Sequence, residues 1–362
     1  MHPPMDKSES ILRQSIANDQ TIFNTNLRTS IPIRNFGIDG GPQGGIAFSR
    51  RRCERAVLRM NDTSPLIAVD GGATSTRVRL LEPATGRVLG EGSAGPSSLT
   101  LGVDQAWRNI SAAVAVAADG LPLRAPRLFC GLAGGRSPTR RAEFHRTDPL
   151  GCAEIVVATD GYASLLGALA GAPGAVLAIG TGVAAFALDA GGGVRSASAW
   201  GFAVGDEGGG AWLGRRAVTC LTQWLDGRIT TPSPLWDSLG AAIGDEFDAI
   251  QVWLAAAGAT QFATLAPLVI DAARGGDAFA LSLLDDATAE LVRAVQAVAP
   301  DGPVALLGGL APTFAPRFPL DLRARLIEPR GTALDGAALM ARDGWREALA
   351  PLPPEEPRHD SP

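Results

Sequence analysis

The chain has 362 residues, of which 46% are hydrophobic and 19% charged, and its formal net charge is -5. This composition is typical of a globular protein that is large enough for two domains. It lacks the basic stripe that general nucleic-acid binding needs, so no nucleic acid is expected as a partner. No apolar run free of Gly, Pro and charge is long enough to span a membrane, and no signal-peptide pattern is present. We therefore expect a cytoplasmic protein with no membrane partner.

Lysine, histidine and cysteine are scarce enough to limit the chemistry. Lys7 is the only lysine, which excludes a Walker-type phosphate loop, a protein-kinase strand lysine and a Schiff-base lysine from the rest of the chain. The only histidines are His2, His145 and His359, so neither a His-centred triad nor a His-rich metal site is expected. The four cysteines show no CxxC spacing, which fits a reducing compartment without structural zinc. Catalysis is expected to use carboxylates, hydroxyls and the backbone.

The two ends of the chain differ in composition from the middle. Residues 1–59 contain the lone lysine, four of the six asparagines and a cluster of arginines. We expect this segment to be either disordered or the product of a misassigned start, with Met60 as the alternative first residue. A basic regulatory arm is the other interpretation. The Pro-rich segment 351–362 is expected to be a flexible tail.

The first half of the remaining chain alternates predicted strands and helices. Residues 66–73, LIAVDGGA, predict a strand that enters a tight loop, and a second apolar segment follows before the turn PATG. Apolar residues at helical spacing predict a helix over 103–117. Residues 127–132 predict a short strand that enters the loop AGGRSP. Residues 154–160, EIVVATD, predict another strand with Asp160 at its carboxyl end, and a helix follows.

The second half repeats the opening pattern. Residues 176–183, VLAIGTGV, again predict a strand that enters a Gly-containing loop, followed by a second apolar segment before the turn AGGG. A long loop over 200–214 and a largely helical region come next. Residues 304–312, VALLGGLAP, predict a strand that enters a Gly pair, and a helix over 335–349 follows. The alternation predicts an α/β fold, in which ligands bind at the carboxyl ends of the strands.

The two Gly-containing loops have a shared chemical meaning. Glycine lacks a Cβ and tolerates unusual backbone angles, so backbone N–H groups in such a loop can approach an anion closely. Two loops of this kind that face one another would hold the phosphates of a nucleotide between two lobes.

Six motifs carry a resemblance to a known family. In chain order they are DGGATSTR, GLAG, ATDGYAS, IGTG, WGFAVGDEGGGAWLG and LLGGLAP. Together they resemble the N-acetylglucosamine and glucosamine kinases of the BadF/BadG/BcrA/BcrD ATPase family, in the sugar kinase, heat-shock protein 70 and actin superfamily. The resemblance implies two ribonuclease-H-like lobes of the actin and hexokinase type, with the active site in the cleft between them. The implied lobes are residues 64–170, which the helix 335–349 could complete, and residues 171–334.

The resemblance also implies a role for individual residues. Asp160 would be the catalytic residue that accepts the proton of the sugar hydroxyl, and Asp70 would bind magnesium directly or through water. The residues that would hold ATP are Asp70, Gly71, Gly72, Thr74, Thr76, Gly180, Thr181, Gly182, Gly308 and Gly309. The residues that would contact the sugar are Ser98, Trp200, Gly201 and Asp206.

The reaction that the resemblance implies is transfer of the γ-phosphate of magnesium-ATP to the 6-hydroxyl of glucosamine or N-acetylglucosamine. The implied partners are the small molecules ATP and sugar, and a homodimer is compatible with the family. Without the resemblance, Asp160 would be read as a helix N-cap, Asp70 as a turn cap and Trp200 as a core residue.

The sequence departs from the amino-sugar kinases at three places. Ser98 stands where Asn is common, Val183 and Ala184 replace a Ser-Asn pair, and SAW replaces the start of a GGWG motif. The first two changes remove polar contacts, which keeps a non-catalytic sugar-responsive binding protein as an alternative. A second alternative is an ATPase activator of a dehydratase or reductase, which needs Cys ligands to an iron–sulfur cluster. Cys130 and Cys152 do not lie in the context that such activators use.

Overall fold

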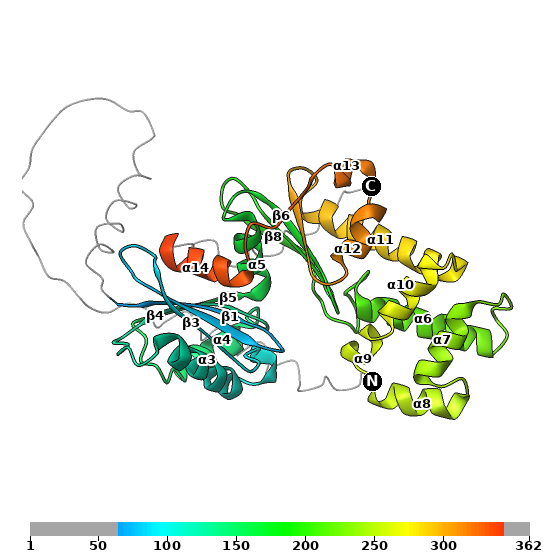
Figure 1. Cartoon of the computed structure of the whole chain (residues 1–362), viewed down its shortest axis with the longest axis horizontal. Coiled ribbons are helices and arrows are strands. Elements are labelled where there is room, and N and C mark those ends of the chain that lie inside the picture. Colours follow the sequence, from blue (N-terminus) through cyan, green and yellow to red (C-terminus); the bar gives the residue numbers. More distant parts are fainter. Residues whose placement is uncertain (1–63, 344–362) are drawn as a thin grey trace, which may run out of the picture. The chain divides into compact units, whose positions relative to one another are not determined.

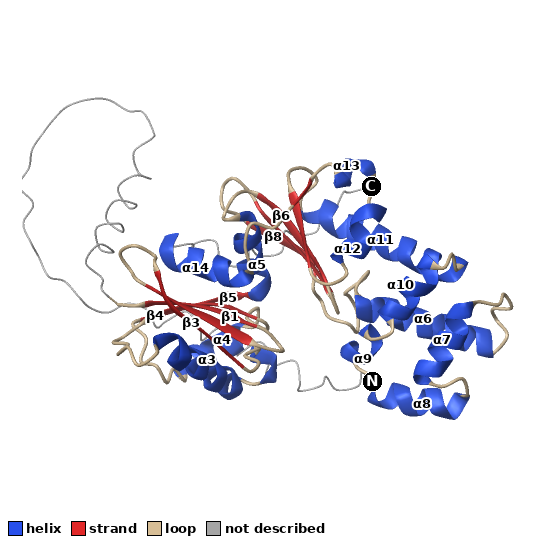
Figure 2. Ribbon diagram, viewed as in Figure 1, coloured by secondary structure: helices blue, strands red, loops and turns tan. Residues whose placement is uncertain are grey.

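The computed structural model describes residues 64–343. The expectations for residues 1–59, for the tail 351–362 and for the last six residues of the helix 335–349 lie outside this range. Two five-stranded mixed sheets organise the described part, and each has helices packed against it (Figures 1 and 2).

The first sheet has the strand order β3-β2-β1-β4-β5. Its strands are β1 (Leu66–Gly71), β2 (Thr76–Leu81), β3 (Val88–Ala94), β4 (Arg127–Leu132) and β5 (Glu154–Thr159). The first three form an antiparallel meander, and the last two continue the sheet in parallel with β1. The predicted strand over 127–132 matches β4 at both ends.

Helices cover both faces of this sheet because successive side chains of a strand point to opposite faces. Ile67 and Val69 of β1 face α3 (Val103–Ala118) and α4 (Pro138–Arg146), whereas Leu66 and Ala68 face α5 (Asp160–Leu169). A short 3₁₀ turn, Leu99–Leu101, precedes α3. The predicted helix over 103–117 is confirmed as α3, and its regularly spaced apolar residues are the buried ones.

The second sheet repeats the arrangement of the first, with the order β10-β9-β6-β7-β8. Its strands are β6 (Gly174–Ile179), β7 (Val183–Leu188), β8 (Val194–Ser198), β9 (Val304–Leu307) and β10 (Leu326–Ile327). Here too an antiparallel meander of three strands is extended by two parallel strands. The repeated hairpin seen in the sequence is therefore part of a repeated five-stranded unit.

Six helices lie between β8 and β9, and short helical segments lie between β9 and β10. They are α6 (Gly210–Leu225), α7 (Pro234–Ile243), α8 (Phe247–Ala256), α9 (Ala259–Ala263), α10 (Ala266–Arg274), α11 (Ala278–Val298), α12 (Ala311–Phe314), η2 (Ala315–Arg317) and α13 (Leu320–Arg323). The predicted loop over 200–214 is too long, because α6 begins at Gly210. The helical character predicted for this region is confirmed.

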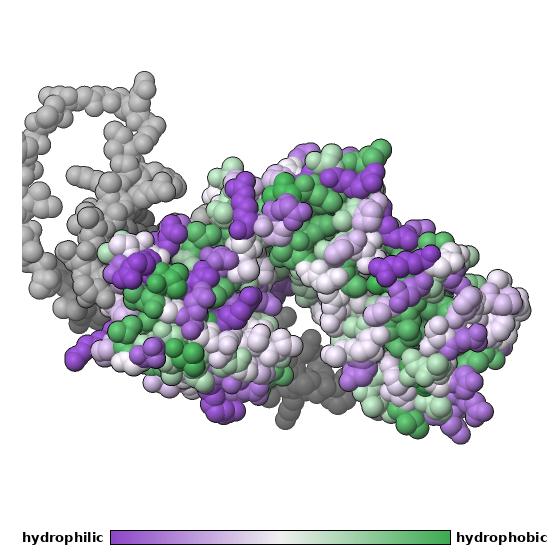
Figure 3. Space-filling model, in the orientation of Figure 1, coloured by the Kyte–Doolittle hydropathy of each residue, from purple (hydrophilic) through white to green (hydrophobic). Residues whose placement is uncertain are grey.

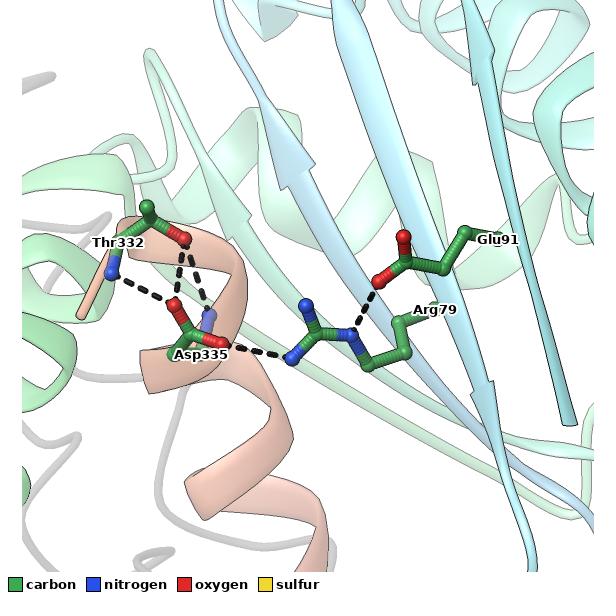
Figure 4. Close-up of polar contacts among 4 residues, drawn as sticks. All are labelled: Arg79, Glu91, Thr332 and Asp335. Atoms are coloured by element: carbon green, nitrogen blue, oxygen red, sulfur yellow. Dashed lines mark hydrogen bonds and ion pairs between the residues drawn. The ribbon is translucent and has the colours of Figure 1, made fainter. Parts of the chain in front are cut away.

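The last described helix, α14 (Ala333–Asp343), returns to the first sheet. It packs on α5, β1 and β4. Thr332 and Asp335 cap its first turn reciprocally, because the Asp335 carboxylate accepts from the Thr332 N–H at 2.7 Å and the Thr332 hydroxyl accepts from the Asp335 N–H at 3.4 Å. The same carboxylate accepts from Arg79 of β2 at 2.7 Å, and Arg79 also donates to Glu91 of β3 (Figure 4).

Within residues 64–343 no helix combines the length and the apolar character that crossing a membrane requires. On the face drawn in Figure 3, hydrophilic and hydrophobic residues are interspersed. Two large apolar side chains of one loop, Trp200 and Val204, are each 77% exposed. Their loop joins β8 to α6, so their exposure concerns the candidate site below.

Candidate functional site

One edge of the first sheet gathers the sequence-predicted residues of the first half. Gly71 pairs with Leu132, which pairs in turn with Thr159, so β1, β4 and β5 end at the same level. The chain that follows each strand therefore emerges at one edge. This edge carries the loop after Gly71, the loop AGGRSP and Asp160, as expected for a ligand site at the carboxyl ends of parallel strands.

Asp70 lies near the end of β1 and pairs in register with Arg77 of β2. Its carboxylate accepts from the Arg77 guanidinium at 2.5 Å, and its side chain is 14% exposed. Asp70 is therefore the partner of an arginine and is not a turn cap. Sequence reasoning missed Arg77, although a hairpin centred between residues 73 and 74 places positions 70 and 77 opposite one another.

The first Gly-containing loop is a tight turn held by backbone bonds. The Gly72 N–H donates to the Ser75 carbonyl at 3.0 Å, and the Gly72 carbonyl accepts from the N–H groups of Ser97 and Ser98. Thr74 is exposed on this loop. Thr74 is thus accessible to a ligand, whereas the N–H and the carbonyl of Gly72 are already paired within the turn.

Thr76 and Ser98 support this loop from the protein interior. Thr76 is fully buried, and its hydroxyl lies 2.6 Å from the Gly95 carbonyl and 2.7 Å from the Ser97 hydroxyl. The Ser98 side chain is 1% exposed and contacts the Thr100 hydroxyl at 2.8 Å. These placements differ from the expectation that both side chains face ATP or sugar, because their hydroxyls already have partners inside the fold.

Asp160 is the first residue of α5, and its carboxylate is free of the capping role. Thr159 is the N-cap, since its hydroxyl accepts from the Tyr162 N–H at 3.1 Å. The Asp160 carboxylate accepts from the N–H of the next residue, Gly161, at 2.9 Å, and the residue as a whole is exposed although protein atoms surround its carboxyl group. Desolvation by the surrounding protein raises the pKa of Asp160, and the nearby charge of Asp70 raises it further. The rise brings this carboxyl closer to the range in which a carboxylate accepts a proton effectively.

The second Gly-containing loop joins β6 to β7 and is held by the start of α6. The N–H groups of Gly210 and Ala211 donate to the carbonyls of Gly180 and Thr181 at 2.8 and 2.9 Å. The Gly pair Gly308 and Gly309, which was also predicted to hold ATP, lies beside this loop. The Leu310 N–H that follows the pair donates to the Ile179 carbonyl at 3.0 Å. The fold therefore brings residues 180–182 and 308–309 together.

Asp206 lies against the second loop. Its carboxylate accepts from the Val183 N–H at 3.4 Å, and a Cβ added at Gly182 would lie 2.5 Å from the same carboxylate. Only glycine at position 182 leaves room for this approach. Desolvation by burial raises the pKa of Asp206, and the charge of Glu207 adds to the rise. Asp206, which was predicted to contact the sugar, therefore also contacts the second Gly-containing loop.

The loop from β8 to α6 holds its backbone in unusual conformations. Ser198, Ala199 and Asp206 all have φ of 61°, which non-glycine residues rarely adopt, and Gly201 has φ of 91°. Trp200 between them is mostly exposed, so it is not a core residue. Strained backbone of this kind concentrates at ligand sites, where the surrounding fold holds it in place.

The donor set at the first sheet edge fits magnesium only in combination with phosphates. Within the described ranges no group of three or more His, Cys, Asp or Glu side chains could bind a metal by itself. Magnesium in nucleotide sites keeps several waters and uses one or two carboxylates with phosphate oxygens. Asp70 could supply such a carboxylate, because it lies beside the first Gly-containing loop at this edge of the sheet.

Comparisons with known proteins show the family of the chain. The chain matches the BadF/BadG/BcrA/BcrD ATPase family over residues 67–311. Glucosamine kinase GspK from Vibrio cholerae is 28% identical over 283 residues, which cover 76% of this chain and 95% of that protein.

Two solved structures, each named a putative N-acetylglucosamine kinase, share the architecture. The one from Chromobacterium violaceum is 38% identical, with a TM-score of 0.70, over 77% of this chain and 99% of its own. The one from Porphyromonas gingivalis is 20% identical, with a TM-score of 0.56 and the same two coverages. The chain therefore belongs to the BadF/BadG/BcrA/BcrD ATPase family, and its two five-stranded sheets form the same fold as the structure from Chromobacterium violaceum.

Proposed function

We propose that this protein is an ATP-dependent kinase that transfers the γ-phosphate to the 6-hydroxyl of an amino sugar, either glucosamine or N-acetylglucosamine. The observation that carries the proposal is the state of Asp160. Its carboxylate is not used as a helix cap and lies at the sheet edge that also carries Asp70. The relatives named glucosamine kinase and N-acetylglucosamine kinase support the choice of substrate class.

The residues divide the reaction between them. The sugar hydroxyl oxygen attacks the γ-phosphorus while the bond from that phosphorus to the bridging oxygen breaks, ADP leaves, and Asp160 receives the hydroxyl proton. The backbone N–H groups of the two Gly-containing loops and the Thr181 hydroxyl orient the phosphates. Magnesium, when bound with ATP near Asp70, supplies positive charge that spreads the charge developing on the phosphates.

The sugar would use the loop from β8 to α6. Trp200 offers an exposed aromatic surface that suits the apolar face of a pyranose, and the polar edge of the sugar needs acceptors such as Asp206. The polar residues that amino-sugar kinases often carry at positions 98, 183 and 184 are absent here. The choice between glucosamine and N-acetylglucosamine therefore rests on experiment.

A sugar panel with purified protein tests the function. ADP release is measured with magnesium-ATP and, in separate reactions, glucose, glucosamine, N-acetylglucosamine and N-acetylmannosamine. We expect ADP release that depends on an amino sugar, and a product whose phosphorus couples to the two protons of carbon 6 by NMR. ADP release without any sugar would instead support an ATPase, and sugar binding without ADP release would support a binding protein.

No observation on the described cysteines favours the activator alternative. Cys130 is fully buried in β4, and burial raises the pKa of its thiol. Burial also raises the pKa of Cys152 to about 12. Both thiols are thus held in the protonated form that binds metals poorly.

A further inference from the structure

Phe186 of β7 makes a contact that no role described so far explains. A Cβ added to Gly161 would overlap the tip of the Phe186 ring, so the ring lies directly against the glycine backbone. Phe186 is 9% exposed and belongs to the second sheet, whereas Gly161 lies in the first turn of α5. The contact therefore joins the second sheet to the residue that follows Asp160.

Gly161 is also the residue that holds the Asp160 carboxylate. Its N–H donates to an Asp160 carboxylate oxygen at 2.9 Å. The direction of this N–H depends on the orientation of one peptide group, and the Phe186 ring restricts how that peptide can move. A side chain at position 161 would push the ring away or rotate the peptide.

A second contact holds the same face of the second sheet in place. Ser196 of β8 is the register partner of Phe186, and paired residues of neighbouring strands point to the same face. The Ser196 hydroxyl accepts from the Arg136 guanidinium at 2.7 Å, and Arg136 lies in the loop after β4. Two neighbouring side chains of the second sheet thus contact two neighbouring segments at the carboxyl edge of the first sheet.

Phe186 also belongs to the strand that leaves the second Gly-containing loop. Val183 begins β7 directly after Gly182, and Phe186 follows three residues later in the same strand. A displacement of β7 would therefore move both the loop and the ring. The α5 helix packs on β6 and β7 as well as on β4, so it can transmit such a displacement to Asp160 (Figure 1).

We propose that Phe186 is a positioning residue, which acts through Gly161 to set the Asp160 carboxylate relative to the phosphate loop on its own strand. The proposal rests on the proposed function, in which Asp160 receives the proton of the sugar hydroxyl. A misplaced carboxylate would slow the chemical step and leave ATP binding nearly unchanged, because no backbone N–H of the phosphate loops is altered.

Three variants test the contact: Gly161→Ala, Phe186→Leu and the double variant. Leucine lacks the ring-tip atoms that the new methyl group would meet, so it restores the missing space. We expect Gly161→Ala to lower kcat by about tenfold or more while the KM for ATP changes less than about twofold. The double variant should recover most of that kcat. A wild-type kcat in Gly161→Ala, or a double variant no better than Gly161→Ala, would overturn the proposal.

A matched control separates positioning from general loss of packing. Phe144 is a fully buried phenylalanine that stacks on Trp107 on the opposite face of the first sheet. Phe144→Leu should lower the melting temperature, leave kcat unchanged below that temperature and fail to rescue Gly161→Ala. Rescue by Phe144→Leu would show that the effect is not local, and would overturn the proposal.

The design also keeps the two proposals apart. Absence of turnover in the wild-type protein on the whole sugar panel would overturn the proposed function and with it the positioning role. The melting temperatures of the wild type, Gly161→Ala, Phe186→Leu and the double variant would still test the contact between the ring and the glycine. We expect the double variant to be more stable than the sum of the single effects predicts, and additive effects would show that ring and glycine do not constrain one another.

Discussion

The two sheets share one strand arrangement but divide the chemistry unequally. In the first sheet charged residues flank the hairpin loop and follow β5, because Asp70 pairs with Arg77 across the hairpin and Asp160 is the first residue after β5. In the second sheet the hairpin loop holds Gly180, Thr181 and Gly182 and no charge. Its nearby carboxylate, Asp206, comes from a separate loop.

The same strand arrangement therefore presents different chemical groups in its two copies. The charged side chains of Asp70 and Asp160 lie at the first sheet, where the register of three strands places them at one edge. The second sheet offers backbone groups and a hydroxyl, which suit phosphates without adding negative charge. The first of the helices inserted between β8 and β9, α6, then supplies the N–H groups that hold its loop.

Asp160→Asn is the strongest way to break this division. Because Thr159 and not Asp160 caps α5, the substitution should leave the melting temperature and ATP binding nearly unchanged. Sugar-dependent turnover should fall by on the order of a hundredfold or more, as expected when a positioned general base is lost. Turnover and thermal unfolding are measured on the same preparation. Near-normal turnover would remove Asp160 from the mechanism.

Gly182→Ala tests the close approach in the second loop. The added methyl group would lie 2.5 Å from the Asp206 carboxylate, so either the loop or the carboxylate must move. We expect the KM for ATP to rise about tenfold, which corresponds to about 1.4 kcal/mol and lies within the range of about 1–3 kcal/mol that overpacking typically costs. Steady-state kinetics at saturating sugar measures the change. An unaltered KM would show that the spacing between Gly182 and Asp206 does not matter for the nucleotide.

Thr181→Val is a milder change in the same loop. Valine keeps the branched shape and removes one hydroxyl, so folding should be preserved. Loss of one hydrogen bond of about 1 kcal/mol would raise the KM for ATP about fivefold. The measurement is the same ATP titration as for Gly182→Ala, and identical kinetics in variant and wild type would argue against a phosphate role for this loop.

Asp335→Asn changes a contact that joins α14 to the first sheet and leaves the candidate site untouched. The interactions with Thr332 and Arg79 outweigh desolvation and lower the pKa of Asp335, so the stabilisation is present above the unfolded pKa. It is lost as the pH falls through the lowered value. We expect the variant to melt about 2 °C below wild type at pH 7, with the gap closing below about pH 4. Turnover at 25 °C should be unchanged.

The exposed pair Asp271 and Arg274 provides the control for that experiment. Asp271→Asn removes an exposed ion pair within α10 that involves no capping side chain, and such pairs contribute little. Its melting temperature should match wild type at both pH values. A gap between wild type and Asp335→Asn that does not depend on pH would contradict the electrostatic account.

The sequence predicted the frame better than the orientation of side chains. The strands at 66–71 and 127–132 are short apolar runs bounded by Pro or Gly. Such local sequence patterns predict strands without knowledge of the tertiary contacts. Thr76 was expected to face a ligand because it belongs to a motif, yet it alternates with Val78 and Leu80 and is buried with them. The period of two along β2 carried that information.

Other features depend on contacts that no local pattern records. The start of α6 at Gly210 is hidden in a Gly-rich segment of low helix propensity, and its first N–H groups are satisfied by the carbonyls of Gly180 and Thr181. The Phe186 ring of the second sheet contacts Gly161 of α5, which follows the last strand of the first sheet. Neither partner has a neighbour in sequence that points to the other.

The ion pair between Arg79 and Asp335 also has a consequence for synthesis on the ribosome. The two residues are 256 positions apart, and α14 covers apolar side chains of α5, β1 and β4. A nascent chain that has completed the first sheet must therefore wait until the second sheet has been translated before its last covering helix arrives. During that interval an apolar face stays open to chaperones or to another chain, and truncation before residue 333 would leave it open permanently.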